Sequence, residues 1–326
     1  MNDQASWQPA SRPATARLRA NMLDRVRKYF QSNQVLEVDT PALSRTAVSD
    51  PHIESIAASL ELAPIAAHYL HTSPEYCMKR LLCDGYPDIY QVCKVFRDNE
   101  VGRHHQPEFT MIEWYRLDYD LDQISKETVA LIAAVLDDPS LPGSVVTITY
   151  SDAFQEFAGC DPLSVGVEEL MALINADTSL QASIGDDKAA WLDLVFDQKV
   201  VPNFEARSLT VLTHYPLDQA ALARQCPDNP DVADRFEVFI GRYELANGYV
   251  ELNDADELAK RFASNQATRR SHGQIERPLD NEFLDAIRHG LPACAGVAVG
   301  FDRLLMIHAG EDDIRNVQTF AYPEME

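Results

Sequence analysis

The chain has 326 residues, of which 46% are hydrophobic and 24% are charged, and this balance excludes a disordered polypeptide. Its 28 Lys and Arg are outnumbered by 51 Asp and Glu, and the resulting net charge of −23 makes a nucleic-acid partner such as tRNA unlikely. Residues 1–14 do not resemble a secretory signal, and no apolar stretch approaches the roughly 20 residues of a membrane span, so we expect a soluble, cytoplasmic protein with no membrane partner.

Apolar periodicity predicts strands first, then a long helical stretch, then strands again. This order favours an α+β fold in which an antiparallel sheet is flanked by helices, rather than a regular βαβ series. The six cysteines are far apart and form no C-x-x-C pair, so neither a zinc cluster nor a disulfide framework is expected. The predicted helices cover residues 14–32, 121–136, 150–158, 167–176, 189–199, 255–271 and 302–308, and the predicted strands cover 35–38, 86–96, 108–117, 235–240, 249–252 and 297–299.

The segment from Phe96 to Phe109 has the highest density of functional side chains. Neither a phosphate-binding G-x-x-x-x-G-K-[ST] loop nor a G-x-G-x-x-G motif occurs in the sequence, so a nucleotide site would need another design. Here Arg97 ends one predicted strand and Phe109 opens the next. Such a hairpin can place a guanidinium on a phosphate and an aromatic face against a base. A solvated hairpin tip with a surface Arg–Glu pair fits the same residues.

The segment from Gly296 to Arg303 alternates small residues with valines before a predicted helix. One face of this strand is nearly bare, so a ligand can lie against its backbone. Arg303, at the start of the helix, can stack on a purine. A glycine-kinked core strand explains the same pattern.

Acidic residues accompany the strands around residues 237–254. Glu237 and the run from Glu244 to Asp254 offer carboxylates that suit Mg²⁺ or an ammonium group. Exposed glutamates in an acidic chain are the alternative. The segment from Thr72 to Glu75 by itself indicates only a turn or a helix start, with Ser73 as a possible cap.

These segments, in this order, closely resemble the class II lysyl-tRNA synthetases over nearly the whole chain. Residues 35–41 resemble motif 1, which builds the dimer interface in that family, so the resemblance implies a homodimer. Residues 96–109 resemble motif 2, residues 296–303 resemble motif 3, and residues 244–254 resemble the strand of the lysine pocket. The implied fold is the class II catalytic domain, and the implied reactants are ATP, Mg²⁺ and lysine or a relative of lysine.

The resemblance also implies roles for individual residues. Arg97 and Arg303 are the expected catalytic residues: Arg97 would hold the α-phosphate, and Arg303 would face Phe109 across the adenine. Glu75 would contact the substrate's amino group, while Glu251 and Tyr115 would hold the distal ammonium, and no Arg or Lys is expected beside Glu251. The expected ATP-binding residues are Arg97, Asp98, Asn99, Glu100, His105, Gln106, Phe109, Glu244, Leu245, Gly300 and Arg303; the expected substrate-binding residues are Ser73, Pro74, Glu75, Tyr115, Asn247, Glu251 and Ala298; and the expected metal ligands are Glu237 and Glu244.

Departures from the synthetase pattern indicate a subfamily. The motif 1 region begins after only about thirty residues, so we expect residues 1–326 to form a single catalytic domain with no N-terminal OB-fold anticodon-binding domain. Ala298 replaces the middle glycine of motif 3, and its methyl group would narrow the floor under the substrate's α-carbon. Asn99 replaces a glutamate near the adenine amine, a role that Glu100 can also fill, and Gln106 replaces an asparagine.

The short N-terminal region, the acidic net charge and Ala298 together resemble the elongation factor P–(R)-β-lysine ligases. The implied activity is a ligase that forms a carbon–nitrogen bond, activating (R)-β-lysine or lysine with ATP and transferring it to a lysine side chain of elongation factor P. Two alternatives stay open: a truncated lysyl-tRNA synthetase-like enzyme that charges tRNA or a small acceptor, and a catalytically silent synthetase-like regulator. The second should have lost its phosphate and metal residues, yet Arg97, Glu237, Glu244 and Arg303 are present.

Overall fold

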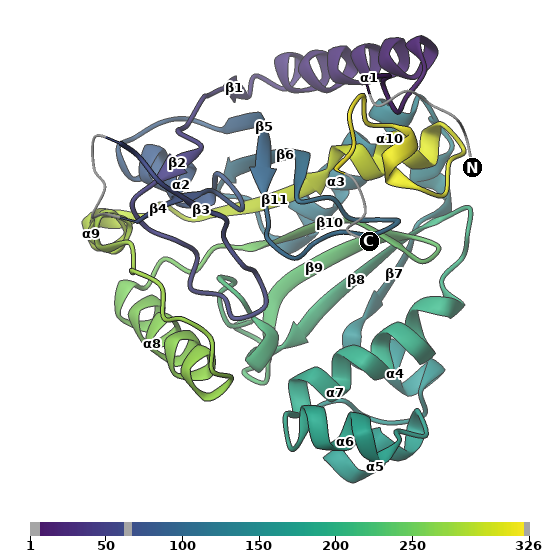
Figure 1. The fold of residues 1–326 in the computed structure, drawn as a ribbon, viewed down its shortest axis with the longest axis vertical. Coiled ribbons are helices and arrows are strands. Elements are labelled where there is room, and N and C mark those ends of the chain that lie inside the picture. The colour runs from purple at the N-terminus through teal and green to yellow at the C-terminus, as the bar shows by residue number, and fades with distance from the viewer. Residues whose placement is uncertain (1–6, 62–66, 323–326) are drawn as a thin grey trace.

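An eight-stranded sheet is the centre of the computed structural model, which describes residues 7–61 and 67–322 (Figure 1). The strand order is β1-β5-β6-β11-β10-β9-β8-β7. The six inner strands are antiparallel, whereas β1 pairs with β5, and β7 with β8, in parallel, so the expected antiparallel sheet is mixed at both edges. The strands are β1 Leu36–Glu37, β5 Ile89–Phe96, β6 Glu108–Leu117, β7 Val146–Thr149, β8 Leu209–Pro216, β9 Val232–Ile240, β10 Tyr243–Val250 and β11 Cys294–Gly300.

Helices cover both faces of this sheet, and a small second sheet lies beside it (Figure 1). The small sheet has the order β2-β4-β3 and is antiparallel. Its strands are β2 Leu43–Ser44, β3 Ala57–Ala58 and β4 His68–Leu70. The helices are α1 Pro13–Ser32, α2 Glu75–Cys83, α3 Leu121–Leu136, α4 Tyr150–Phe157, α5 Val167–Leu173, α6 Thr178–Ile184, α7 Lys188–Val195, α8 Ala255–Ser271, α9 Asn281–Gly290 and α10 Phe301–His308.

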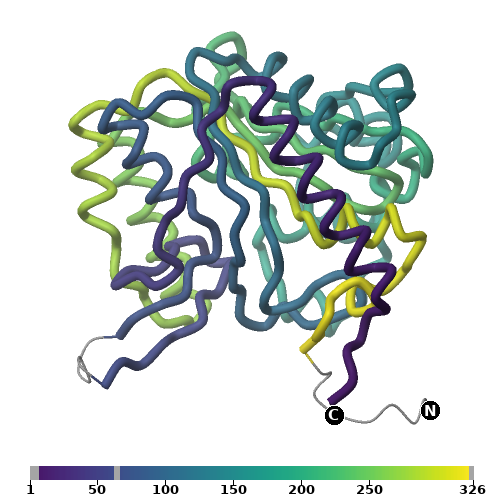
Figure 2. The backbone as a smooth tube through the Cα atoms, turned by 90° about the horizontal axis from the view of Figure 1, so that it is seen from above, coloured from purple at the N-terminus to yellow at the C-terminus, as the bar shows by residue number. Residues whose placement is uncertain are grey.

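The main core lies between one face of the sheet and helices α1, α3 and α10. In α1 the fully buried residues Met22, Val26 and Phe30 recur every four positions and so form one stripe. Pro13 lies in the first turn, where its missing N–H is not needed. Figure 2 shows α1, in purple, running across the yellow C-terminal elements, in agreement with the α1–α10 contact.

The opposite face of the sheet carries two smaller apolar clusters. Helices α2, α8 and α9 form one of them, and α8 begins where the Asp254 side chain accepts hydrogen bonds from the backbone N–H groups of Asp256 and Glu257. Helices α4–α7 form the other, packed on β8 and β9. The two groups lie at different ends of the sheet in Figure 1. The strip of sheet between them carries the polar side chains described below.

The structure confirms most of the expected elements and corrects several boundaries. The strand expected over 249–252 begins earlier and ends earlier, as β10 Tyr243–Val250, and includes Asn247-Gly248, which resembles a turn. The reason is packing: a Cβ at Gly248 would lie 2.7 Å from both Phe236 Cε1 and Val297 Cβ, so close strand pairing requires glycine there.

Other differences lie in the middle of the chain. The expected helix 189–199 ends as an α-helix at Val195 and continues as one π-turn, Phe196–Val200. The strand expected over 86–96 begins at Ile89, the helix expected over 167–176 ends at Leu173, and the strand expected over 235–240 begins at Val232. Sequence analysis missed β7, β8, α6, α9 and the small sheet.

No helix within the described residues combines the length and the apolar character needed to cross a bilayer.

Candidate active site

The side chains of the candidate site project from one face of the sheet because strand residues alternate between its two faces. Gly296 pairs with Tyr115 on β6 and with Tyr249 on β10. Two residues further along β11, Ala298 pairs with Glu113 and Asn247. The bare face of β11 therefore forms a floor between two rows of polar and aromatic side chains.

A buried cation links two of the carboxylates at one end of this floor. Lys79 on α2 is 1% exposed, and its Nζ lies 2.6 Å from Glu75 Oε1 and 2.5 Å from Glu251 Oε2. The expectation that no Arg or Lys lies beside Glu251 was therefore wrong. Sequence analysis missed this contact because Glu251 is 172 positions away in the chain, and only the Glu75–Lys79 spacing of four residues on a helix was visible.

Glu113 is the third carboxylate of this end and is buried like Glu251, whereas Glu75 is partly exposed; sequence analysis did not select Glu113. The Ser73 hydroxyl donates to Glu113 Oε2 and the Tyr115 hydroxyl to Glu113 Oε1, both at 2.7 Å. Burial, followed by the nearby Glu75, raises the pKa of Glu113 to about 7. A lone acidic residue inside the apolar strand segment Met111–Tyr115 was the signal that could have revealed it. We call Glu75, Glu113, Glu251 and Lys79 the acidic pocket.

Glu251 is a second buried carboxylate of the acidic pocket. Its residue is 4% exposed, and Oε1 has no hydrogen-bond partner within the described part of the chain. A Cβ at Gly296 would collide with Glu251 Oε1 and the Tyr115 ring, so glycine makes the room for both. Burial raises the pKa of Glu251 to about 8, although Lys79 acts in the opposite direction. The carboxamide oxygen of Asn247 is likewise buried and lacks a partner among the described residues. Such groups are suited to a polar ligand.

Ser73 and Pro74 lie at the start of α2 and place Glu75 in its first turn. Ser73 Oγ accepts from the Glu75 N–H at 3.0 Å, but the N-cap of α2 is Pro74 and no side-chain cap forms there, so the expected capping by Ser73 is not observed. The Tyr249 hydroxyl donates to Glu75 Oε1 at 2.6 Å. The structure thus brings the substrate-binding candidates together at the acidic pocket, with Ala298 beside it on the floor.

Arginines gather at the other end of the floor. The Arg97 guanidinium carbon lies 5.2 Å from the centroid of the Phe109 ring, and Arg97 Nη1 lies 3.6 Å from Glu100 Oε1. The structure therefore contains the Arg–Glu pair, while the binding of a phosphate and a base by this hairpin stays a prediction. Asn99 adopts φ 64°, a left-handed conformation that asparagine tolerates, and turns the chain between Arg97 and Glu100. The Asn99 N–H donates to Asp98 Oδ1 at 2.9 Å.

Arg303 lies in the first turn of α10, which begins at the end of β11. Its Nη1 donates to the Glu244 carbonyl, and its Nη2 lies 3.1 Å from His105 Nε2. Burial and the Arg303 charge lower the pKa of His105. We call Arg97, Arg303 and His105 the basic end.

Three further ATP-binding candidates contribute in different ways. Gly300 is the residue before α10, whereas the Leu245 side chain lies in the core behind the sheet, so only its backbone can face a ligand. Gln106 is 1% exposed; its Oε1 accepts from the Tyr322 N–H at 2.7 Å and its Nε2 donates to the His105 carbonyl at 3.2 Å, so its amide already binds the chain.

The expected metal ligands lie on neighbouring strands. Glu237 on β9 is buried, and its Oε1 lies 2.6 Å from Arg235 Nη2. Burial, followed by the charge of Glu244, raises the pKa of Glu237 to about 7. The Glu244 side chain is 44% exposed. Two carboxylates that repel each other, one of them accessible, suit a divalent cation.

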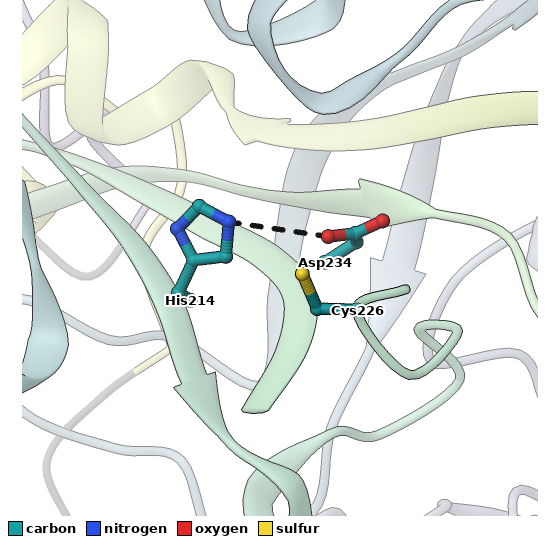
Figure 3. A group of neighbouring side chains, drawn as sticks. All are labelled: His214, Cys226 and Asp234. Atoms are coloured by element: carbon teal, nitrogen blue, oxygen red, sulfur yellow. Dashed lines mark ion pairs between the residues drawn. The ribbon is translucent and has the colours of Figure 1, made fainter. Parts of the chain in front are cut away.

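The structure also assembles His214, Cys226 and Asp234, whose ligand atoms lie within 4.8 Å of one another (Figure 3). Arg224 Nε lies 2.7 Å from Asp234 Oδ2. Asp234 is the one carboxylate of this group and Arg224 offsets its charge, whereas Glu237 and Glu244 together keep a net negative charge beside Arg235. We therefore assign no metal to this group and regard it as an ion pair with a neighbouring imidazole and thiol.

Comparisons with known proteins agree with this geometry. Residues 7–325 match the family model of the class II tRNA synthetases of the D, K and N type. The chain is 40% identical to an elongation factor P–(R)-β-lysine ligase of Sodalis glossinidius, over 98% of this chain and 99% of that protein. It is 39% identical to proteins of the same name from Yersinia enterocolitica, over 98% of each chain, and Photorhabdus laumondii, over 98% of this chain and 99% of that protein.

Proposed function

Since the chain belongs to the class II tRNA synthetase family of the D, K and N type and is a ligase, we propose that it activates (R)-β-lysine or lysine with ATP and transfers the acyl group to a lysine side chain of elongation factor P. The acceptor and the β-amino acid come from the names of its relatives. The activation step rests on the site itself.

The observation that carries the proposal is the opposite charge at the two ends of one floor. The acidic pocket holds three carboxylates and one lysine, while the basic end presents two arginines. A diamino acid has ammonium groups that suit the first end, and ATP has phosphates that suit the second. The bare face of β11 between them lets the substrate carboxylate approach the α-phosphate.

In the first step the substrate carboxylate attacks the α-phosphorus of ATP. A bond forms between a carboxylate oxygen and phosphorus, the bond from the α-phosphorus to the bridging oxygen breaks, and pyrophosphate leaves. Arg97 stabilises the negative charge that develops on the phosphate oxygens, while the Phe109 ring and Arg303 hold the adenine. No side chain acts as a nucleophile.

Glu237 and Glu244 would hold Mg²⁺, because they are adjacent carboxylates whose mutual repulsion a dication relieves. When bound, the ion would neutralise phosphate charge. Arg235 keeps Glu237 oriented, since its Nη2 lies 2.6 Å from Glu237 Oε1.

In the second step the amine of the acceptor lysine attacks the carbonyl carbon of the acyl-adenylate. An amide bond forms, the bond from the carbonyl carbon to the phosphate oxygen breaks, AMP leaves, and the amine loses a proton. The acidic pocket keeps the acyl group in place during this exchange.

The intact mass of elongation factor P tests the proposal, after incubation with the protein, ATP, Mg²⁺ and (R)-β-lysine. We expect a single lysyl-sized increase, while total tRNA in a parallel reaction stays uncharged. Charging of tRNA with an unmodified factor would instead support the truncated synthetase. Inactivity on both acceptors, together with no amino-acid-dependent exchange of pyrophosphate into ATP, would support the silent regulator.

We also propose a single catalytic domain and a homodimer. One sheet contains strands from β1, which begins at Leu36, to β11, which ends at Gly300. The early and late parts of the chain are therefore hydrogen-bonded into one unit. Strand β1 lies at a sheet edge, where Leu36 is 46% exposed, and Leu43 nearby is 38% exposed. An exposed apolar edge is a natural surface for a second copy. Light scattering of the purified protein, giving the mass of one or two chains, tests this.

A further inference from the structure

Lys79 is a fully buried cation that the proposed mechanism does not yet use. Lysine is almost never completely buried unless its charge is paired. Here the ammonium bridges Glu75 on its own helix and Glu251 beyond the end of β10, and it lies 5.3 Å from the centroid of the Tyr249 ring. Lys79 therefore joins two segments of the pocket that are far apart in the chain.

The Lys79 ammonium contacts one carboxylate oxygen of Glu75 and one of Glu251. Glu75 Oε1 accepts hydrogen bonds from the Lys79 ammonium and from the Tyr249 hydroxyl, and within the described residues no group donates to Glu75 Oε2. Glu251 Oε2 faces Lys79, while Glu251 Oε1 is buried without a hydrogen-bond partner in the described part of the chain. Two carboxylate oxygens, one from each residue, are thus held in place and left for a ligand.

The net charge of the acidic pocket also matches a ligand with two ammonium groups. Glu75, Glu113 and Glu251 contribute three negative charges when ionised, and Lys79 offsets one of them, which leaves two. The acyl group of a diamino acid carries two ammonium groups. A buried site accepts charge at low cost only when positive and negative charges match.

We infer that Lys79 is a positioning residue and a resident cation, which fixes one oxygen each of Glu75 and Glu251 and leaves two negative charges for the two ammonium groups of the substrate. This inference rests on the proposed function, because it takes a diamino acid as the ligand.

Removal of Lys79 should change the pH dependence of ligand binding. Lys79 lowers the pKa of Glu251, so its removal should move the ionisation of Glu251 to higher pH. Binding of the ammonium groups requires ionised carboxylates, and the pH midpoint of binding should move with it. The charged and titratable groups around Glu251 are Lys79 and Glu75 from α2, Glu113 and Tyr115 from β6, Tyr249 from β10 and Cys294 from β11.

Calorimetric titration with (R)-β-lysine and with lysine, between pH 6 and pH 9, tests the inference on the full-length protein. For Lys79→Met we expect the Kd at pH 7 to rise about a hundredfold, with an alkaline shift of the midpoint, while the Kd for ATP stays unchanged. Lys79→Arg keeps the charge and should keep the wild-type midpoint. An unshifted midpoint in Lys79→Met, or equal shifts in both variants, would overturn the inference.

Chemical rescue separates charge from bulk. Lys79→Ala leaves a space that propylammonium matches, and we expect millimolar propylammonium to restore binding there, while 1-propanol does not. In Lys79→Met the side chain fills that space, so propylammonium should have no effect. Equal effects of the amine and the alcohol would show that Lys79 serves only as packing.

If Lys79→Met does not fold, the same comparison is made in the Glu75→Gln background. Glu75→Gln, Lys79→Met has the same two net charges as the wild-type pocket, and its binding midpoint should still lie alkaline of Glu75→Gln alone. Identical midpoints would overturn the inference. Wild-type protein that binds neither diamino acid would contradict the proposed function itself, whereas normal wild-type binding with unaltered variants would contradict only the role of Lys79.

Discussion

The acidic pocket and the basic end of the site differ in how their charges are held. In the pocket, Lys79, Glu113 and Glu251 are at most 4% exposed. Lys79 lies on α2, Glu113 lies on β6, and Glu251 directly follows β10. At the basic end, the Arg97 and Arg303 side chains are 24% and 18% exposed and lie next to a loop and a helix start. Buried charges in regular elements are preorganised for one ligand shape, whereas partly exposed charges exchange partners easily.

This difference indicates that amino-acid specificity is built in before the ligand arrives. At the basic end, Glu100 and the Glu244 carbonyl now occupy the guanidinium groups that phosphate and adenine would take over. Changes at the pocket should therefore affect the amino acid alone, and changes at the basic end should affect ATP alone. The following variants test that division.

The largest effect is expected for Glu251→Gln. It removes the buried charge that would face the distal ammonium of the proposed substrate, and losing such a partner costs about 2–5 kcal/mol, or roughly 30- to 5,000-fold in kcat/KM for the amino acid. Pyrophosphate exchange measured at varied amino acid and varied ATP checks this, with an unchanged KM for ATP. Glu276→Gln, an exposed residue paired with Arg270, is the matched control. Near-normal exchange in Glu251→Gln would remove Glu251 from the ammonium site.

Arg97→Met should lower kcat for exchange by about 10²–10³, the usual effect of removing one donor that stabilises transition-state charge. The Kd for the amino acid should not change, because the acidic pocket is intact. Stopped-flow or steady-state exchange gives the first quantity and calorimetry the second. Arg270→Met, in which another exposed guanidinium is removed, should match the wild type; a similar loss there would mean that Arg97 acts through general charge.

Affinity for the diamino acid should increase from pH 6 to pH 8 by up to about a thousandfold, about tenfold from Glu113 and about a hundredfold from Glu251. Burial raises the pKa of Glu113 to about 7 and of Glu251 to about 8 in the free protein, so both are largely protonated below those values. Ammonium binding requires the ionised forms, and each pH unit below the pKa therefore weakens binding by up to about tenfold. Calorimetry between pH 6 and pH 9 would show an affinity that levels off above pH 8. A flat profile between pH 6 and pH 8 would contradict the raised pKa values.

The smallest effect is expected for Ala298→Gly. Removing one methyl group from the floor should shift the ratio of kcat/KM from (R)-β-lysine towards lysine by about tenfold, since one methylene in a pocket changes specificity by about 10–200-fold. Parallel exchange assays with the two isomers measure the ratio, and the KM for ATP should stay constant. An unmoved ratio would show that the floor does not select the isomer.

Local signals in the sequence determined much of this protein. The four-residue stripe of α1, the Asp254 cap of α8 and the apolar run of β6 each follow from neighbours in the chain, and each element appears where it was expected. The residues of the acidic pocket and the basic end were also selected from four short segments and their resemblance to a known family, with Glu113 and Lys79 as the omissions.

Only the tertiary structure decided how the charges are paired. Lys79 meets Glu251 because α2 and the segment after β10 belong to one apolar cluster, which includes Met78 and Leu252, and no local pattern encodes a contact between residues so far apart in the chain. The same holds for Asn247-Gly248, which resembles a turn but lies in a strand because Phe236 and Val297 leave no room for a Cβ. Chain neighbours set backbone preference, whereas burial and the balance of buried charge depend on every segment that closes around a site.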